Sequence, residues 1–120
     1  MLATTLRRRT EEKIRSWVVD RFHRYYYDNK ETTWLVNNFL GHQICQLPSD
    51  LWLYQELIYR VRPQYIVQTG VYFGGSALFF AHMLDLVGAD PSAVYVGIDV
   101  ELKAEARALQ HPRIRLIEGS

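Results

Sequence analysis

Cysteine is almost absent from this 120-residue chain, which carries only Cys45 and therefore cannot form an internal disulfide. A single thiol fits a reducing compartment, so we expect a cytoplasmic protein in which Cys45 is buried rather than reactive. An excess of one charge is absent as well, because 14 lysines and arginines are balanced by 13 acidic residues. The resulting net charge of +1 gives no overall sign of nucleic-acid binding, and we expect no nucleic-acid partner.

The chain also lacks an uninterrupted apolar run. Residues 64–84 carry no charged side chain and could span a bilayer by length, but Gln64, Gln68, His82 and three glycines interrupt them. We therefore expect no transmembrane segment. Histidines are scattered, and none has a partner at a standard metal-ligand spacing, so we expect no metal site in this chain. The four are His23, His42, His82 and His111.

The chain does have the composition of a globular protein, with 48% apolar and 22% charged residues. Its length allows one domain or part of one. No internal repeat or low-complexity linker is present. The pattern changes at about residue 47. Residues 1–47 predict a helical N-terminal segment, and residues 48–120 predict an α/β unit.

The N-terminal segment is basic and aromatic. Thr10 is the expected N-cap of an amphipathic helix that continues to about Asp28. We expect its apolar face to pack and its basic face to be solvated; binding of the basic face to an anionic membrane or an acidic substrate is the alternative. A short helix over residues 32–40, stopped by Gly41, is expected next. We expect the segment to act as a lid or a packing element. The apolar face comprises Ile14, Trp17, Val18, Phe22 and Tyr25.

Residues 64–84 predict a buried strand, a glycine turn and an apolar helix. Tyr65, Ile66 and Val67 form a short apolar run that is typical of a parallel sheet. Glycines follow in the turn, and residues 77–87 predict a helix that is apolar on nearly every side and must be covered on every side. Strand, turn and helix make the first half of a βαβ unit, and such turns bind ligands.

The glycine spacing narrows the choice of ligand. Tyr72 stands where a dinucleotide fingerprint, G-x-G-x-x-G, has its second glycine, which disfavours a nicotinamide oxidoreductase. Ser76 stands where a phosphate-binding P-loop has its lysine. Bare backbone N–H groups without a cation suit a small carboxylate and a neutral nucleoside, the make-up of S-adenosyl-L-methionine (SAM). A tight turn that binds no ligand is the alternative.

A second buried strand is expected over residues 93–98, and it ends in Asp99. A carboxylate at this place can accept hydrogen bonds from both hydroxyls of a ribose lying across the strand ends. The alternative is that Asp99 caps a helix expected to begin at Glu101, and both roles are compatible.

The remaining elements flank these strands. A helix is expected over residues 49–61, with Ser49 or Asp50 as its cap and a stop before Pro63. Its buried stripe is expected to hold Leu51, Tyr54, Leu57, Ile58 and Val61. A further helix is expected over residues 102–110, and a third strand over residues 114–117.

Several blocks lie in one register over roughly residues 25–120. They are PSDLWLYQELIYRVRP (48–63), QTGVYFGGSA (68–77), GID (97–99), HPRI (111–114) and EGS (118–120). Together they resemble the cephalosporin hydroxylase / rhamnosyl O-methyltransferase family. The resemblance implies the N-terminal half of a Rossmann-like SAM-dependent methyltransferase fold, with parallel strands in the order 3-2-1. It also implies methyl transfer to a hydroxyl of a saccharide or another natural product.

The resemblance further implies roles for single residues. The turn from Thr69 to Ser76 would hold the methionine part of SAM, Asp99 the ribose, and Gly119 and Ser120 the adenine. The cofactor-binding set is Gln68, Thr69, Gly70, Gly74, Gly75, Ser76, Asp99, Gly119 and Ser120. The family usually has Glu where this chain has neutral Gln68. A divalent cation such as Mg²⁺ is implied by the family alone, with ligands beyond this chain. No residue here is named as catalytic.

Family members continue well beyond Ser120, into a fourth strand that would pair with the first. Without it the first strand lies at an open edge of the sheet. We therefore expect this chain to be marginally stable, self-associated through that edge, or a fragment of a longer protein. The alternative function is a non-catalytic nucleoside-binding or interaction remnant of the same fold.

Overall fold

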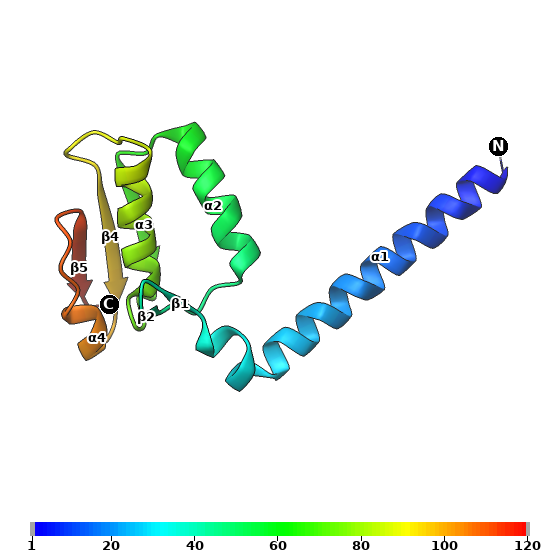
Figure 1. Cartoon of the computed structure of the whole chain (residues 1–120), viewed down its shortest axis with the longest axis horizontal. Coiled ribbons are helices and arrows are strands. Elements are labelled where there is room, and N and C mark those ends of the chain that lie inside the picture. The colour runs from blue at the N-terminus through cyan, green and yellow to red at the C-terminus, as the bar shows by residue number, and fades with distance from the viewer. Residues whose placement is uncertain (1, 120) are drawn as a thin grey trace.

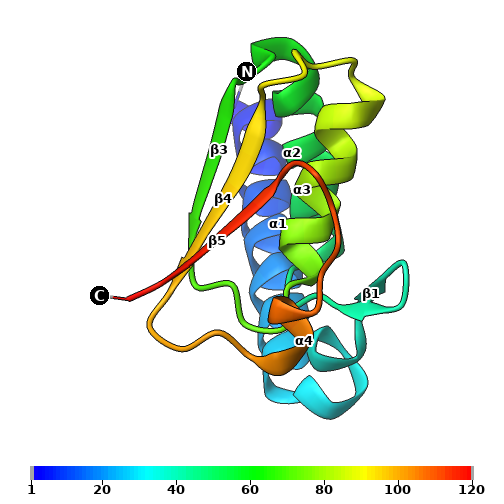
Figure 2. The same cartoon turned by 90° about the vertical axis from the view of Figure 1, so that its left-hand side faces the viewer.

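A parallel sheet of three strands forms the centre of the body in the computed structural model, which describes residues 2–119. The strands are β3 (Tyr65–Thr69), β4 (Val94–Asp99) and β5 (Ile114–Glu118), and β4 lies between the other two (Figures 1 and 2). The expected α/β class and the 3-2-1 order, with the first strand at an edge, are therefore confirmed. The strand over Tyr65–Thr69 forms as expected, but its expected burial is wrong, because Tyr65 and Val67 lie on the uncovered side of the edge strand and are exposed.

The register brings the carboxyl ends of the strands to one edge. Thr69 pairs with Ile98, and Asp99 pairs with Glu118 on the next strand. Residues that follow a strand therefore meet residues from the neighbouring strand at this end. The short helix α4 (Ala104–Arg107) lies beside the same end (Figure 2).

Two helices, α2 (Pro48–Val61) and α3 (Gly75–Leu86), lie on one face of the sheet (Figure 2). Helix α3 contributes more buried residues to the core than any other described element, as its uniformly apolar sequence requires. The other face has no helical cover among residues 2–119, and Val67 on the edge strand is 63% exposed. The buried cluster contains Ile44, Ile58, Ala77, Phe79, Phe80, Leu84, Ala93 and Tyr95.

Helix α1 (Leu2–Asp28) projects away from the body (Figure 1). It begins before Thr10, whose hydroxyl donates to the carbonyl of Leu6 inside the helix instead of capping it. Every side chain from Thr5 to Asp28 is exposed except that of Tyr26. The expected packing of the apolar face is therefore wrong for this chain, because no described element lies against that face.

A β-hairpin replaces the helix expected over residues 32–40. Two short 3-10 turns, η1 (Lys30–Thr32) and η2 (Trp34–Val36), lead into β1 (Asn38–Phe39) and β2 (His42–Gln43). The strands pair antiparallel, with Leu40 and Gly41 between them. Both linking residues have positive φ, of 49° and 82°, as a two-residue hairpin turn requires. Gly41 therefore closes a hairpin rather than a helix.

The flanking elements differ in detail from expectation. Helix α2 has Leu47 as its N-cap with no side-chain hydrogen bond, so neither expected cap is used. The helix expected over residues 102–110 is reduced to one turn, α4. The third strand is present and extends to Glu118. The division of the chain at residue 47 stays a prediction, and Ile44 from the first part lies in the core beside α3.

None of the helices described here combines the length and the apolar character needed to cross a membrane. Cys45 is half-buried, and burial raises the pKa of its thiol. A raised pKa leaves the thiol protonated and weakly reactive, as expected, but the expected burial of Cys45 is only partial.

Candidate cofactor site

The turn between β3 and α3 exposes backbone at its beginning and buries it at its end. Gly70 is exposed, has φ of 79°, and has no atom within 4 Å of the place where a Cβ would stand. Its N–H donates to the carbonyl of Ile98 at 2.9 Å, which ties the turn to β4. Gly70 can therefore bring bare backbone close to a ligand.

Gly74 and Gly75 are required by protein packing instead. A Cβ on Gly74 would lie 2.7 Å from Cδ1 of Leu109, and one on Gly75 would lie 2.3 Å from the carbonyl oxygen of Gln43. Ser76 is buried, and its hydroxyl bonds with the Tyr95 side chain. Their assignment as cofactor contacts stays a prediction, and the structure gives each a role in the interior.

Gln68 links the turn to the core. Its Oε1 accepts a hydrogen bond from the Tyr95 hydroxyl at 2.9 Å, and its Nε2 donates to the carbonyl of Gly70 at 2.9 Å. Burial raises the pKa of Tyr95, so the phenol stays neutral and able to donate. A glutamate at position 68 could accept from the phenol but could not donate to Gly70. Neutral Gln68 therefore matches this conformation of the turn.

Asp99 ties the end of β4 to the same turn. Its Oδ2 accepts from the backbone N–H groups of Val71, at 2.8 Å, and Tyr72, at 3.1 Å, while Oδ1 accepts from Glu101 at 3.2 Å. The hydrogen bonds from Tyr72, Glu101 and Val71 lower the pKa of Asp99 and keep it ionised. The alternative, that Asp99 caps the next helix, is wrong, because Lys103 is the N-cap of α4. These bonds occupy both lone-pair positions of Oδ2 and one of Oδ1, which leaves at most one position, on Oδ1, for a ribose hydroxyl.

Glu118 supports this arrangement and was missed from the sequence. Its Oε2 accepts from the N–H of Leu102 at 2.9 Å and from the Arg107 guanidinium, which holds the loop between β4 and α4. The next residue, Gly119, is exposed and donates to the carbonyl of Asp99 at 2.9 Å. Ser120 lies outside the described residues. The register of the expected third strand opposite Asp99 could have pointed to Glu118.

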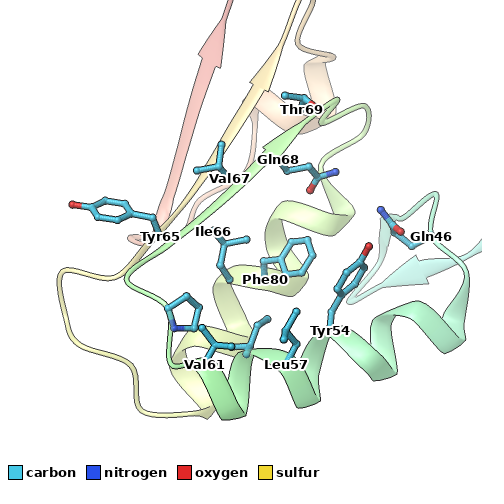
Figure 3. Close-up of a pocket in the computed structure, with 12 residues that line it drawn as sticks. Gln46, Tyr54, Leu57, Val61, Tyr65, Ile66, Val67, Gln68, Thr69 and Phe80 are labelled. Carbon is cyan, nitrogen blue, oxygen red and sulfur yellow. The ribbon is translucent and has the colours of Figure 1, made fainter.

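An open groove of about 470 Å³ runs between α2 and β3 (Figure 3). Ile66 and Phe80 face Tyr54 and Leu57 across it, whereas Tyr65 points away. Gln68 and Thr69 lie on the same wall, so the groove reaches the carboxyl end of β3. The stripe of α2 was expected to be buried, which is wrong for Tyr54, Leu57 and Val61, because they are exposed beside the open groove, whereas Ile58 is buried.

A second polar group, also missed, lies at the far end of α3. His82 and Asp85 stand one turn apart and approach His111, and their ligand atoms lie within 4.8 Å of one another. Two histidines and a carboxylate can bind zinc, and the i, i+3 spacing could have pointed to this group. Asp85 already accepts from Arg113 Nε at 2.5 Å and from His111 Nε2 at 3.1 Å.

The hydrogen bonds of this group fit a structural clamp better than a metal. His111 Nδ1 accepts from the Arg113 N–H at 3.2 Å, which places the imidazole proton on Nε2, facing Asp85. A metal on Nε2 would move that proton to Nδ1 and set two donors against each other. The hydrogen bond from Arg113 lowers the pKa of Asp85. The absence of a metal site stays a prediction, and this geometry supports it.

The features above define a class of protein. A parallel sheet, a glycine turn tied to an acidic strand end, and apolar helices on one face make half of a Rossmann-like nucleoside-binding unit. A family model described as Rhamnosyl O-methyltransferase/CmcI matches residues 31–120. The chain belongs to this family, and the resemblance seen in the sequence is confirmed.

Individual relatives agree with this assignment. The rhamnosyl O-methyltransferase of Mycobacterium leprae is 33% identical over 102 residues, covering 85% of this chain and 43% of that protein. The protein of the same name from Mycobacterium bovis is 28% identical over 103 residues, covering 86% and 41%. This chain thus spans about two-fifths of the length of these relatives.

Solved structures of CmcI share the fold. A form described as Mg-SAM has a TM-score of 0.64 at 25% sequence identity and covers 72% of this chain and 37% of that one. A form described as SAH has a TM-score of 0.57 at 25% identity and covers 70% and 43%. The expected Rossmann-like methyltransferase fold is confirmed by these neighbours and by the parallel sheet.

Proposed function

We propose that this chain is the cofactor-binding half of a SAM-dependent O-methyltransferase. The observation that carries the proposal is the position of Asp99, whose carboxylate joins the end of β4 to the exposed part of the glycine turn. A nucleoside lying across the strand ends would meet a carboxylate and bare backbone together. Membership of a family whose structures include SAM and SAH forms supports the same ligand.

The proposed contacts divide by the exposure of each residue. Thr69 and Gly70 present exposed backbone to the methionine part, Asp99 receives a ribose hydroxyl on Oδ1, and Gly119 borders the adenine. Gln68 positions the turn from beneath through its bond to Gly70. The buried residues Gly74, Gly75 and Ser76 contribute by fixing the start of α3, where the helix dipole favours a carboxylate.

The acceptor is proposed to be a saccharide hydroxyl, as the names of the Mycobacterium relatives suggest. Transfer breaks the bond between the sulfonium sulfur and its methyl carbon, forms a bond from that carbon to the acceptor oxygen, and releases the hydroxyl proton. In-line placement of the two reactants and a base for that proton are needed. No described side chain meets both needs, and we assign no catalytic residue.

Magnesium does not fit the described part of this site. The carboxylates at the strand ends are those of Asp99 and Glu118, and both accept hydrogen bonds from the protein. Mg²⁺ takes oxygen ligands in near-octahedral geometry, which these two residues do not supply. The ligands of a metal in this family would therefore lie outside residues 2–119.

We also propose that copies of this chain associate through the open side of β3. The strand pairs with β4 alone among the described elements, so its other edge presents unpaired backbone groups. Exposed Val67 and the groove beside α2 add apolar surface to that edge. A cytoplasmic location is proposed from the single, weakly reactive thiol.

The function is tested by calorimetric titration of the chain with S-adenosylhomocysteine, the product that lacks the unstable sulfonium. We expect saturable binding that is lost in Asp99→Ala. Because Asp99 also holds the turn, Glu118→Gln serves as a matched control that weakens a neighbouring loop without removing the ribose contact. Circular dichroism checks that each variant folds. A folded wild-type chain that does not bind would contradict the proposal and favour the non-catalytic remnant.

A further inference from the structure

Tyr72 adopts a backbone conformation that bulky residues seldom take. Its φ is 52°, in the left-handed region that glycine and asparagine usually occupy. Within residues 2–119, two other non-glycine residues share this feature, and local structure explains both: Leu40 closes the hairpin and Arg62 ends α2 as its C-cap. Tyr72 instead lies in the turn that the proposed cofactor would contact.

The contacts of Tyr72 do not explain why a large side chain stands there. Its N–H donates to Asp99 Oδ2, a bond that any residue could make. The ring is 45% exposed and lies against Phe73, with ring centroids 4.2 Å apart. Its neighbour Val71, by contrast, is 2% exposed and anchors the turn in the interior. The tyrosine ring is therefore held at the surface of the turn, on a strained backbone, without filling the core.

The position of Tyr72 in the glycine pattern indicates what its side chain could exclude. Gly70 and Gly75 occupy the first and third glycine positions of G-x-G-x-x-G, and Tyr72 occupies the second. The third glycine of that pattern serves close packing of the helix, and Gly75 does so here against Gln43. The second must lack a side chain so that the backbone can approach a pyrophosphate. Asp99 stands where the ribose acid of such a site stands.

We propose that Tyr72 is a cofactor-selecting residue that keeps a nucleoside diphosphate away from the N-terminus of α3. The proposal rests on the proposed function, because it assumes that adenosine lies against Asp99. A ligand with a thioether and a small carboxylate needs no close backbone approach at position 72. A pyrophosphate needs that approach, and the side chain prevents it. The strain at Tyr72 is then the consequence of placing a side chain where the turn requires a glycine conformation.

The test is calorimetric titration of the wild-type chain and Tyr72→Gly with ADP and with S-adenosylhomocysteine. ADP is the probe because the first βαβ half of a dinucleotide site holds adenosine and pyrophosphate. We expect Tyr72→Gly to bind ADP at least about tenfold more tightly than wild type, because phosphate can then approach the N-terminus of α3. S-adenosylhomocysteine affinity is expected to change by less than about threefold.

Two variants control for strain and for size. Leu40→Gly makes the same kind of change at a left-handed residue outside the site and is expected to leave ADP affinity unchanged. Tyr72→Asn tolerates the left-handed conformation but keeps a side chain, and is expected to gain less than the glycine variant. Thermal unfolding verifies that all four proteins are folded.

The results separate this inference from the proposed function. If wild type binds S-adenosylhomocysteine and Tyr72→Gly gains no ADP affinity, the role of Tyr72 is refuted and the function stands. If Tyr72→Gly gains ADP affinity while no protein binds S-adenosylhomocysteine, the function fails and the selecting role stands. Wild type that binds ADP as tightly as the variant, or folded proteins that bind neither ligand, would overturn the inference.

Discussion

Substitution of Gly75 by alanine tests how the N-terminal hairpin is attached to the rest of the chain. Gly75 begins α3, and its φ does not lie in the left-handed region, so alanine fits its backbone. Helix propensity alone therefore predicts a gain of ~0.5–1 kcal/mol from this change. The atoms packed around Gly75 predict a loss of stability instead, so the sign of the measured change decides between the two effects.

The added Cβ would lie 2.3 Å from the carbonyl oxygen of Gln43 and 2.8 Å from Cβ of Ile44. Neither atom can move by a simple side-chain rotation. The oxygen of Gln43 belongs to the backbone, and the Cβ of Ile44 is bonded directly to its own backbone Cα. Either the strain of overpacking remains, at ~1–3 kcal/mol, or the hairpin moves away. In the second case Ile44, which is 2% exposed, loses burial worth ~1.5–3 kcal/mol. We expect Gly75→Ala to lower the free energy of unfolding by about 1–3 kcal/mol.

Urea unfolding of the 120-residue chain measures this change, and limited proteolysis between residues 37 and 47 reports whether the hairpin detaches. Gly88→Ala is the matched control, because Gly88 has φ of 62° and no atom within 4 Å of its Cβ position. Backbone strain should cost that variant ~1–2 kcal/mol without faster cleavage of the hairpin. A Gly75→Ala protein that is as stable as wild type, or more stable, would refute the packing argument.

Two further predictions concern the other end of α3 and the sheet edge. Arg113 lowers the pKa of Asp85, so this carboxylate stabilises the fold above its unfolded pKa of about 3.9, and the contribution is lost as pH falls through the lowered folded value. Asp85→Asn should therefore lose less thermal stability than wild type between about pH 5 and pH 2. A variant with the same pH profile as wild type would contradict this role. Val67→Lys places a charge on the open strand, and sedimentation should show less self-association than wild type with S-adenosylhomocysteine binding retained; equal association would exclude this edge as the interface.

The strand, turn and strand around Asp99 could be predicted because their signals are local. Short apolar runs that end at glycine or aspartate indicate strands of a parallel sheet, and the 3-2-1 order of the three strands came from the resemblance to the family. Even Glu118 was within reach once the third strand was placed opposite Asp99. The register of β3, β4 and β5 then brings these ends together without further information.

The hairpin and the long first helix could not be predicted in the same way. Leucine has a high helix propensity, so Leu40 gives no sign of a turn in the sequence. Only its left-handed φ, set by pairing of β1 with β2, shows the turn. Helix α1 continues before Thr10, where Arg7 and Arg8 form exposed ion pairs one turn apart with Glu11 and Glu12. Its apolar face suggested packing, but a periodic pattern does not tell whether the partner belongs to the same chain.

The glycines of the turn show why a motif in the sequence overstates a ligand site. Gly70, Gly74 and Gly75 look equivalent in a pattern of spacing, yet only Gly70 has open space around it. The other two let the start of α3 approach Leu109 and the hairpin backbone, so their absence of side chains serves the fold. Tyr72, the residue that breaks the glycine pattern, is the exposed and strained member of the turn. The proposed selectivity for the ligand therefore depends on the position where glycine is missing, because that is the position at which a pyrophosphate site requires bare backbone.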